Sequence, residues 1–400
     1  MRILLTANAS YAPPRGGATR SNLLWLDSLA RAGHQCRVVC GASREGAELR
    51  HHESIVICPV EDPAHRIEAL CREIAAFQPD WVLVSSEDLG HGLLREAHHS
   101  AGGRVVYLAH TPQFFPFGPA SWNPDTNAAR LVADAAGIVA IGRHMAEYIE
   151  RSLGRPAVVI HPPIYGSGPF PLLANFARGL VTMINPCEVK GISLFLEITE
   201  RLPDLAFGAV PGWGTTAADR RAVERLPNVR WVPNAASIDD LLAGTHLLLM
   251  PSLWYEGFGL IVMEAMLRGI PVVASDSGGL CESKCGTGYV IPVQGIERYQ
   301  PVYDELAMPC PVVPPNDPAP WVEAVRRLIT DRAEYERESA ASRQAAHRFV
   351  GSLDAGGMER YLDALQPGRQ IKCGRTTIES LSPEKRALLL ERLRKRGAGR

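Results

Sequence analysis

The stretch PSLWYEGFGLIVMEAMLRGIPVVAS (251–275) decides the fold class. A run with strand character ends in its first residues, a turn with Gly257 and Gly259 follows, and 260–267 holds good helix formers. A strand, a glycine turn and a helix in this order form the unit of a parallel α/β sheet. They place unpaired backbone N–H groups outside the carboxyl end of the strand, where an anion can bind.

Two carboxylates, Glu256 and Glu264, flank this predicted anion site. A carboxylate is a poor neighbour for phosphate but a good acceptor for vicinal hydroxyl groups. Two such acceptors on either side of an anion site therefore suit a sugar, a diphosphate and a ribose in line, as in a nucleotide sugar. From these nine residues alone, a buried helix with solvated glutamates at its ends explains the pattern equally well.

Short runs rich in Val, Ile and Leu recur outward from this stretch, separated by segments of helical period. This pattern is typical of strands buried on both faces of a parallel sheet, and we predict an α/β protein with two doubly wound sheets. The runs occupy residues 2–7, 36–40, 54–60, 81–86, 104–110, 137–141 and 157–161 in the first half, and 180–185, 205–210, 229–233, 247–251, 271–275 and 289–293 in the second half.

Proline and glycine between 162 and 179 indicate a linker between two Rossmann-like domains. We expect helices at 18–33 and 321–350 on the sheet faces or the outer surface, and an ordered surface loop at 301–320, where prolines are frequent. The predicted order is an N-terminal domain (1–165), a linker (166–178), a C-terminal domain (179–350), a C-terminal helix (351–366) and a basic tail with a short amphipathic helix (367–400).

Composition limits the partners. The 400 residues carry 42 basic and 43 acidic side chains, so no global charge favours nucleic acid. Nine cysteines without a Cys-x-x-Cys pair suit a reducing compartment, and no metal site is expected from Cys281 and Cys285. The apolar stretch near the N-terminus is too short for a secretory signal, and no apolar run is long enough for a transmembrane segment. We therefore expect a cytoplasmic protein.

Five segments in a fixed order resemble a known family. They are PPRGGATRSNLLWLDSLARAGHQCRVV (13–39), YLAHTP (107–112), VAIGRHMAEYIE (139–150), NPCEVKGISLFLEITERLPDLAF (185–207) and the E-x7-E stretch from Glu256 to Glu264. Together they resemble the retaining glycosyltransferases of family 4, which have the two-domain GT-B fold, and the resemblance spans about residues 1 to 365.

The resemblance implies transfer of a sugar, with retention and without metal or other cofactor, from a nucleotide diphosphate sugar to a hydroxyl acceptor. The acceptor would bind mainly to the N-terminal domain (1–165). Glu256 would contact the transferred sugar, Glu264 the ribose, and Lys190 the diphosphate, where it offsets leaving-group charge. The resemblance also assigns to the donor site Gly16, Gly17, Asn185, Gly257, Phe258, Gly259 and Leu260.

One position departs from the family pattern. These enzymes usually carry an arginine five residues before the lysine, and here the residue is Asn185. A neutral amide stabilises a diphosphate less than a guanidinium does, so either another cation such as Arg15 compensates or the donor is handled differently. By the same resemblance His110 contacts the donor sugar or the acceptor and completes a catalytic set with Glu256 and Lys190, although a structural histidine is an alternative.

The acceptor region has few sequence signals. Arg15, Phe117 and Trp122 are weak candidates for acceptor contacts, and the two aromatic residues could equally cap the core. Arg143 and His144 are weaker candidates again, at a position where the family often has a serine.

The tail segment LSPEKRALLLERLRKR (381–396) resembles short helices at the ends of nonribosomal peptide synthetase modules. If that resemblance is meaningful, residues 380–396 dock on an assembly-line protein and the acceptor is a peptide or polyketide natural product. A frayed, solvated C-terminus is the alternative.

Two other functions remain compatible with the sequence. A nucleotide sugar epimerase would need an acid and base pair, for which Glu256 and His110 are the only candidates. A non-catalytic scaffold that binds sugar nucleotides is favoured by Asn185 and by the tail.

Overall fold

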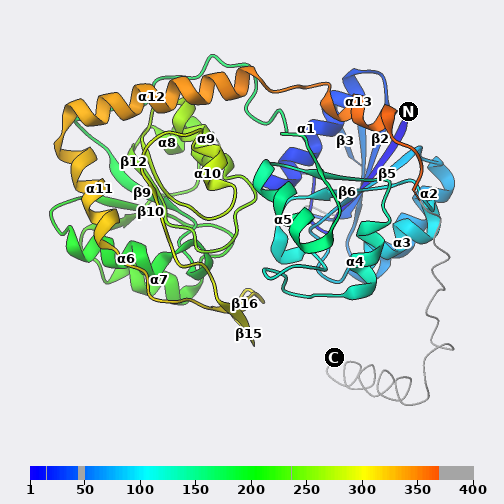
Figure 1. Cartoon of the computed structure of the whole chain (residues 1–400), viewed down its shortest axis with the longest axis horizontal. Helices are drawn as coiled ribbons and strands as arrows, with labels where there is room; N and C mark the ends of the chain where they lie inside the picture. Colours follow the sequence, from blue (N-terminus) through cyan, green and yellow to red (C-terminus); the bar gives the residue numbers. More distant parts are fainter. Residues whose placement is uncertain (15, 44–49, 236, 369–400) are drawn as a thin grey trace.

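The computed structural model describes residues 1–14, 16–43, 50–235 and 237–368. Figure 1 shows two α/β halves side by side, each with a twisted sheet between helices. In the described part of the first half, the strands follow the order β3 (Arg50–His52), β4 (Ile55–Val60), β2 (Gln35–Gly41), β1 (Arg2–Thr6), β5 (Trp81–Ser85), β6 (Val105–Ala109), β7 (Gly137–Ala140) and β8 (Val158–Val159).

The second sheet repeats the same winding. Its described strands follow the order β11 (Val229–Trp231), β10 (Phe207–Val210), β9 (Leu180–Ile184), β12 (Thr245–Met250), β13 (Val272–Ser275) and β14 (Val290–Ile291), all parallel. In each sheet the order reverses beside the first strand, between β1 and β5 and between β9 and β12. The prediction of two doubly wound sheets is confirmed, and each predicted apolar run overlaps one of these strands.

Helices cover both sheets. The first half has α1 (Gly17–Arg31), α2 (Pro63–Phe77), α3 (Gly92–Ala101), the short 3-10 helix η1 (Pro112–Phe114), α4 (Thr126–Ala133) and α5 (Arg143–Leu153). The second half has the 3-10 helix η2 (Glu188–Lys190), α6 (Ile192–Arg201), α7 (Ala217–Glu224), α8 (Ile238–Leu242), α9 (Leu260–Leu267), α10 (Leu280–Ser283), α11 (Ala319–Thr330) and α12 (Arg332–Gly351), and α13 (Gly357–Ala364) follows.

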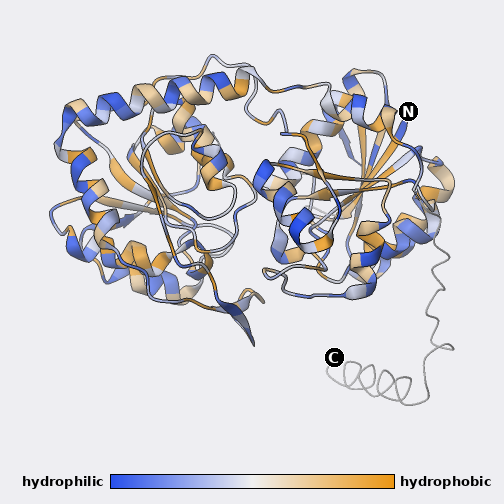
Figure 2. Ribbon diagram, viewed as in Figure 1, coloured by the Kyte–Doolittle hydropathy of each residue, from blue (hydrophilic) through white to orange (hydrophobic). Residues whose placement is uncertain are grey.

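Successive residues of a strand point to opposite faces of the sheet and so belong to different apolar clusters. Leu5 of β1 belongs to a cluster on one face of the first sheet, and its neighbour Leu4 belongs to a cluster on the other face. The first of these clusters continues through Phe258 and Leu248 into one face of the second sheet. The two halves therefore share apolar packing, while Figure 2 shows the outer helix faces as hydrophilic.

Two sequence predictions are wrong in detail. The helix expected at 321–350 is two helices, α11 and α12, because Asp331 interrupts the first and its carboxylate accepts the N–H of Glu334 at 3.0 Å as the N-cap of the second. The loop expected at 301–320 begins as an antiparallel hairpin of β15 (Arg298–Tyr303) and β16 (Pro309–Val312). This hairpin projects from the second half in Figure 1.

The end of the described chain returns to the first half. Helix α13 packs on α1, where the His34 ring lies 2.9 Å from the Glu359 carboxylate, and the Tyr361 side chain lies against Gly137 of β7. The chain therefore crosses between the two halves twice, at residues 160–179 and again between α12 and α13 (Figure 1). Among the described residues, no helix combines the length and the hydrophobicity that crossing a bilayer requires.

Candidate active site

The turn after β12 carries the first predicted carboxylate. Glu256 is buried, and its Oε1 accepts a hydrogen bond of 2.6 Å from Ser252 Oγ at the start of the same turn. The same oxygen forms an ion pair with Lys190 Nζ. The structure thus brings together two residues 66 positions apart that the sequence predicted for sugar and diphosphate.

Lys190 reaches Glu256 because η2 packs directly against this turn. Gly191 follows with φ +81°, and a Cβ there would collide with the Pro251 carbonyl, so the close approach requires glycine. Lys190 Nζ also lies 4.2 Å from the centre of the Trp254 ring, within cation–π distance. The ammonium is therefore held between a carboxylate and an indole, both from the turn after β12.

The N-termini of α9 and α1 meet at the site. Gly259 is the N-cap of α9 with φ +90°, and Gly16 is the N-cap of α1, also with φ +90°. A Cβ at Gly17 would lie 2.9 Å from Leu260 Cδ1, so the first turns of the two helices touch across the two halves. Free N–H groups and the positive ends of two helix dipoles suit an anion here.

Glu264 lies one turn further along α9 and is also buried. Burial raises the pKa of its carboxyl group, while Arg20 and Arg268 act in the opposite direction. Arg20 Nη1 from α1 lies 3.7 Å from Glu264 Oε1. The two carboxylates of the E-x7-E stretch thus stand on either side of the helix N-terminus, as the sequence predicted.

His110 follows β6 in the first half, and its ring is buried. Its Nε2 lies 2.7 Å from Asn22 Oδ1, and the Asn22 amide nitrogen donates to Tyr11 at 2.8 Å and to Ser85 at 3.2 Å. Since Asn22 Oδ1 can only accept, Nε2 carries the proton and Nδ1 presents a lone pair, which has no hydrogen-bond partner in the described structure. Burial lowers the pKa of His110 to about 3, so the ring is neutral.

The His110 backbone also marks where the two halves meet. A Cβ at Gly257 would collide with the His110 carbonyl oxygen, so glycine at 257 lets the Glu256 turn approach the end of β6. The turn between β12 and α9 (residues 251–259), which carries the predicted donor residues and is called the donor turn below, therefore faces the histidine, although the sequence places them in different halves.

Asn185 organises a neighbouring loop. It has φ +58°, a conformation that asparagine tolerates better than most residues. Its Oδ1 accepts the N–H of Gly214 at 2.9 Å and lies 3.4 Å from Thr215 Oγ1, while its Nδ2 is buried and has no partner among the described residues. The held loop presents Trp213, whose exposed indole lies 5.2 Å from the Trp254 ring centre.

Other predicted site residues lie in different surroundings. The Phe258 ring stacks on Phe349 of α12 at 5.4 Å, and a Cβ at Gly142 in the first half would lie 3.2 Å from Phe258 Cδ2. The side chain therefore packs between the two halves, and only its backbone lies in the donor turn. Phe117 is buried against Phe115 at 5.2 Å and belongs to the aromatic core of the first half. Its predicted acceptor contact has no support in the structure, because its ring has little exposed surface.

Trp122 crosses to the second half. Its ring centre lies 6.5 Å from that of Trp254 and 5.6 Å from that of Tyr299 in β15. Trp122 therefore stands one ring away from the Lys190 site, while Arg15 lies outside the described residues. Trp254 and Asn22 could not be identified from sequence patterns, because their roles depend on contacts between segments that lie far apart in the chain.

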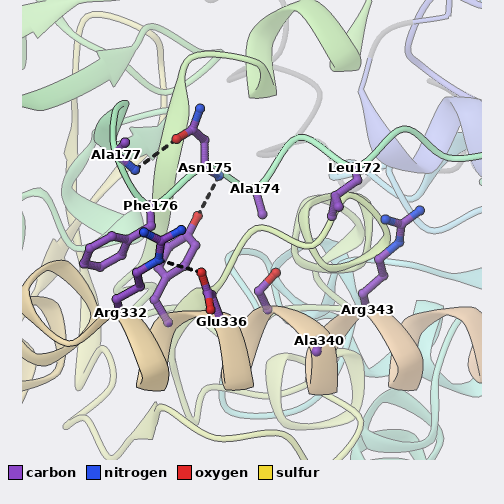
Figure 3. Close-up of a pocket in the computed structure, with 11 residues that line it drawn as sticks. Leu172, Ala174, Asn175, Phe176, Ala177, Arg332, Glu336, Ala340 and Arg343 are labelled. Carbon is purple, nitrogen blue, oxygen red and sulfur yellow. Dashed lines mark hydrogen bonds and ion pairs between the residues drawn. The ribbon is translucent and has the colours of Figure 1, made fainter.

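A cavity of about 530 Å³ lies elsewhere, between residues 172–177 and α12 (Figure 3). It contains none of the predicted site residues. The Tyr335 hydroxyl accepts the N–H of Asn175 at 3.1 Å, and Arg332 pairs with Glu336 at 2.8 Å. The hydrogen bond from Asn175 to Tyr335 joins the linker to α12, whereas the Arg332–Glu336 pair lies within the helix, and Figure 3 shows Asn175 and Phe176 of the linker beside α12. We therefore interpret the cavity as part of the packing that anchors the linker.

Comparison with known proteins identifies two related families. Residues 15–165 match the family described as Glycosyltransferase Family 4, and residues 177–331 match the family described as Glycosyl transferases group 1.

Two curated relatives match parts of the chain. The alpha-1,3/1,6-mannosyltransferase alg-2 of Neurospora crassa is 26% identical over 184 residues, which are 43% of this chain and 34% of the relative. The lipopolysaccharide core biosynthesis mannosyltransferase LpsB of Rhizobium meliloti is 30% identical over 129 residues, or 27% of this chain and 35% of the relative. The matches thus span about a third of the length of each relative.

Solved structures with the same fold cover almost the whole chain. Sucrose-phosphate synthase from Thermosynechococcus elongatus has a TM-score of 0.68 at 16% identity, over 91% of this chain and 99% of that one. HepE of Anabaena in complex with UDP and glucose has a TM-score of 0.61 at 17% identity, over 91% and 98%. WaaG, a glycosyltransferase involved in lipopolysaccharide biosynthesis, gives 0.61 at 16%, over 92% and 100%. These likenesses confirm the GT-B fold.

Proposed function

We propose that this chain, which unites the two glycosyltransferase-type domains of the GT-B fold, transfers a sugar from a nucleotide diphosphate sugar to a hydroxyl group of an acceptor. We further propose that the anomeric configuration is retained, that no metal or resident cofactor takes part, and that the reaction occurs in the cytoplasm.

The observation that carries this proposal is the Lys190–Glu256 pair beside the facing N-termini of α1 and α9. Two helix N-termini and an ammonium group suit a diphosphate. Glu256 on one side and Glu264 on the other are acceptors for the hydroxyl groups of a sugar and of a ribose. The order of charges along the site is the order of groups in a nucleotide sugar.

Donor binding would replace the ion pair between Lys190 and Glu256. Without ligand, Lys190 and Glu256 neutralise each other. A bound donor would offer its diphosphate to the ammonium and sugar hydroxyl groups to the carboxylate, so both charges gain new partners as the old contact breaks. As the bond between sugar and phosphate lengthens, negative charge grows on the leaving diphosphate and its attraction to Lys190 strengthens, which lowers the barrier.

His110 would bind the sugar without taking a proton from it. Its Nδ1 lone pair can accept a hydrogen bond from a sugar hydroxyl group, and a pKa of about 3 makes the ring a weak base at neutral pH. This favours transfer over the epimerase alternative, which would require His110 to act as the partner acid or base of Glu256. Since the described residues around the proposed sugar position suggest no further base, we propose front-face attack, in which the leaving phosphate accepts the proton of the acceptor hydroxyl group.

Thermal unfolding with UDP, GDP, TDP and ADP in EDTA tests the proposal. One diphosphate at about 100 times its Kd should stabilise the native protein by roughly 3 kcal/mol. Lys190→Met should abolish this shift, because it removes the cation and keeps the side-chain volume. Arg72→Met is the matched control: it removes an exposed cation on α2 that pairs with Glu68 and should leave the shift intact.

Product analysis then separates the functions. With the matching sugar nucleotide, a transferase consumes donor in step with acceptor, and proton NMR of the product gives its anomeric configuration. Conversion of the donor alone to a second sugar nucleotide would support the epimerase, and diphosphate binding without turnover on any acceptor would support the scaffold. If none of the four diphosphates stabilises the native protein, the proposed donor site is wrong.

The acceptor is a proposal of its own. The predicted docking segment 380–396 lies outside the described residues. We propose a peptide or polyketide natural product as acceptor on the strength of its resemblance to assembly-line segments. Equal activity and specificity of residues 1–367 and of the whole chain on such an acceptor would argue against docking.

A further inference from the structure

Glu282 of α10 is a carboxylate that the sequence analysis did not single out. Its side chain is 1% exposed, although α10 belongs to the second half. Among the described residues, its hydrogen-bond and ion-pair partners lie in the first half or at the start of the crossing segment 160–179. Its Oε2 accepts the backbone N–H of Arg143 at 2.6 Å and lies 3.4 Å from that of His144. Its Oε1 lies 2.9 Å from His161 Nε2 and 3.5 Å from Arg143 Nε.

These contacts cap a helix across the two halves. Helix α5 begins after Gly142, which has no side chain to accept the first N–H groups, and Glu282 takes that place. A Cβ at Gly142 would lie 2.9 Å from Glu282 Oε2, so the residue preceding the helix leaves room for the foreign carboxylate. The charge also complements the positive end of the α5 dipole.

Burial raises the pKa of the Glu282 carboxyl group, but the hydrogen bonds from His161 and from the Arg143 N–H outweigh it, so the pKa is lower than usual. The group is therefore an anion when the two halves are in contact. Separation of the halves would leave both the carboxylate and the first turn of α5 without these partners.

A short path leads from Glu282 to the donor turn. The glycine turn just before α10 donates the Gly279 N–H to the Glu256 carbonyl at 2.8 Å. Gly257, the next residue, approaches the His110 carbonyl of the first half so closely that no Cβ would fit. Hence the segment that positions Glu282 also holds the backbone of Glu256, whose carboxylate is proposed to contact the sugar.

A second hydrogen bond connects the same turn of α5 to the second half. The Tyr255 hydroxyl group donates to the His144 carbonyl oxygen at 2.9 Å, and Tyr255 precedes Glu256 directly. Arg143 and His144, weak candidates for acceptor binding, thus offer their backbone groups to the second half. The first turn of α5 is held from both sides by residues that flank the donor turn.

We propose that Glu282 is a positioning residue that latches the two halves in the closed arrangement and so holds Glu256 opposite His110 for sugar transfer. This role rests on the proposed function as far as turnover is concerned, but the latch itself is a property of the fold. A residue that influences activity would thus lie in α10, outside the proposed donor site itself. Closure then favours the state in which both halves contact the sugar.

Three variants test the latch. Glu282→Ala removes all of its contacts, and Glu282→Gln keeps an acceptor oxygen for one N–H group but loses the charge. Asp88→Ala is the matched control, because Asp88 is equally buried and accepts the N–H groups of Leu93 and Leu94, at 2.8 and 3.2 Å, within the first half alone. All three should cost stability, so stability does not discriminate between them.

Small-angle X-ray scattering should show a larger radius of gyration for Glu282→Ala than for the native protein and for Asp88→Ala, with Glu282→Gln in between. Affinity for the diphosphate that stabilises the native protein should change by less than about threefold, because its predicted contacts other than α1 lie in the second half. Turnover of the matching sugar nucleotide, UDP-glucose or GDP-mannose, should fall by roughly tenfold or more in kcat, and Glu282→Gln should recover part of it.

An unchanged radius of gyration with native kcat in Glu282→Ala would overturn the latch. So would an equal loss of kcat in Asp88→Ala, since it would mean that general destabilisation explains the effect. If no diphosphate binds the native protein, the proposed function fails, while the scattering comparison still decides whether Glu282 holds the halves together.

Discussion

The burial of the His110 ring predicts how the stability of the protein depends on pH. In the folded chain the pKa of His110 is about 3, against an ordinary value of 6.5, because the ring is buried. Between these two values the unfolded chain binds a proton that the folded chain excludes. The contribution of His110 to the free energy of unfolding therefore falls as the pH falls from about 6.5, and this contribution becomes constant below about pH 3.

The magnitude follows from the size of the shift. One pKa unit corresponds to about 1.4 kcal/mol. At pH 5, which is about 1.5 units below the unfolded value, His110 alone should cost about 2 kcal/mol relative to pH 7.5. In His110→Gln the amide nitrogen can still donate to Asn22 Oδ1, but the side chain no longer titrates, so this variant should lack that part of the loss.

Urea unfolding at pH 5.0 and 7.5, followed by tryptophan fluorescence, measures the difference. His98 is the matched control, because burial also lowers its pKa, to about 4, and it lies on α3 away from the donor turn. Both His110→Gln and His98→Gln should flatten the pH dependence by about 2 kcal/mol, but only His110→Gln, which lacks the Nδ1 lone pair, should reduce turnover. An equal pH dependence in the native protein and in His110→Gln would refute the neutral, buried imidazole.

Two further predictions concern the donor site. Glu264→Gln should weaken binding of the stabilising diphosphate by roughly tenfold, as expected for a lost charge-assisted hydrogen bond to a ribose hydroxyl, and calorimetric titration would detect it; unchanged affinity would exclude the ribose contact. Asn185→Arg, which introduces the cation usual at this position in the family, should lower stability by roughly 1 to 2 kcal/mol without tightening the diphosphate, because it removes the acceptor for the Gly214 N–H and strains φ. Tighter binding in that variant would contradict the structural role of Asn185.

The strands were predictable because burial on both faces leaves continuous apolar runs in the sequence. Strand β3, Arg50–His52, was not, since it is a polar edge strand of three residues that pairs antiparallel with β4. The hairpin of β15 and β16 was hidden by its prolines, which exclude a central strand but are compatible with a two-stranded hairpin. The break before α12 did leave a trace, because Asp331 followed by Glu334 is an N-cap pattern.

The candidate site was predictable where one segment supplies it. The glycine turn and the two glutamates follow from 251–275, and their flanking positions at the N-terminus of α9 agree with the expectation. The direction of a side chain in such a turn was not predictable: Phe258 leaves the donor turn to stack on Phe349. Glu282 could not be found at all, because its partners exist only when the two halves are in contact.

The departure at Asn185 has a structural explanation that charge alone does not suggest. The residue adopts a left-handed conformation, and its side-chain oxygen holds the loop that carries Trp213. Trp213 lies on Trp254, and Trp254 lies beneath the Lys190 ammonium group. Position 185 thus acts on the proposed diphosphate site through packing, by shaping the indole surface on which Lys190 rests. The buried Nδ2 group of Asn185 retains a free N–H donor at the same place, which a diphosphate oxygen could accept without the second full charge that an arginine would bring.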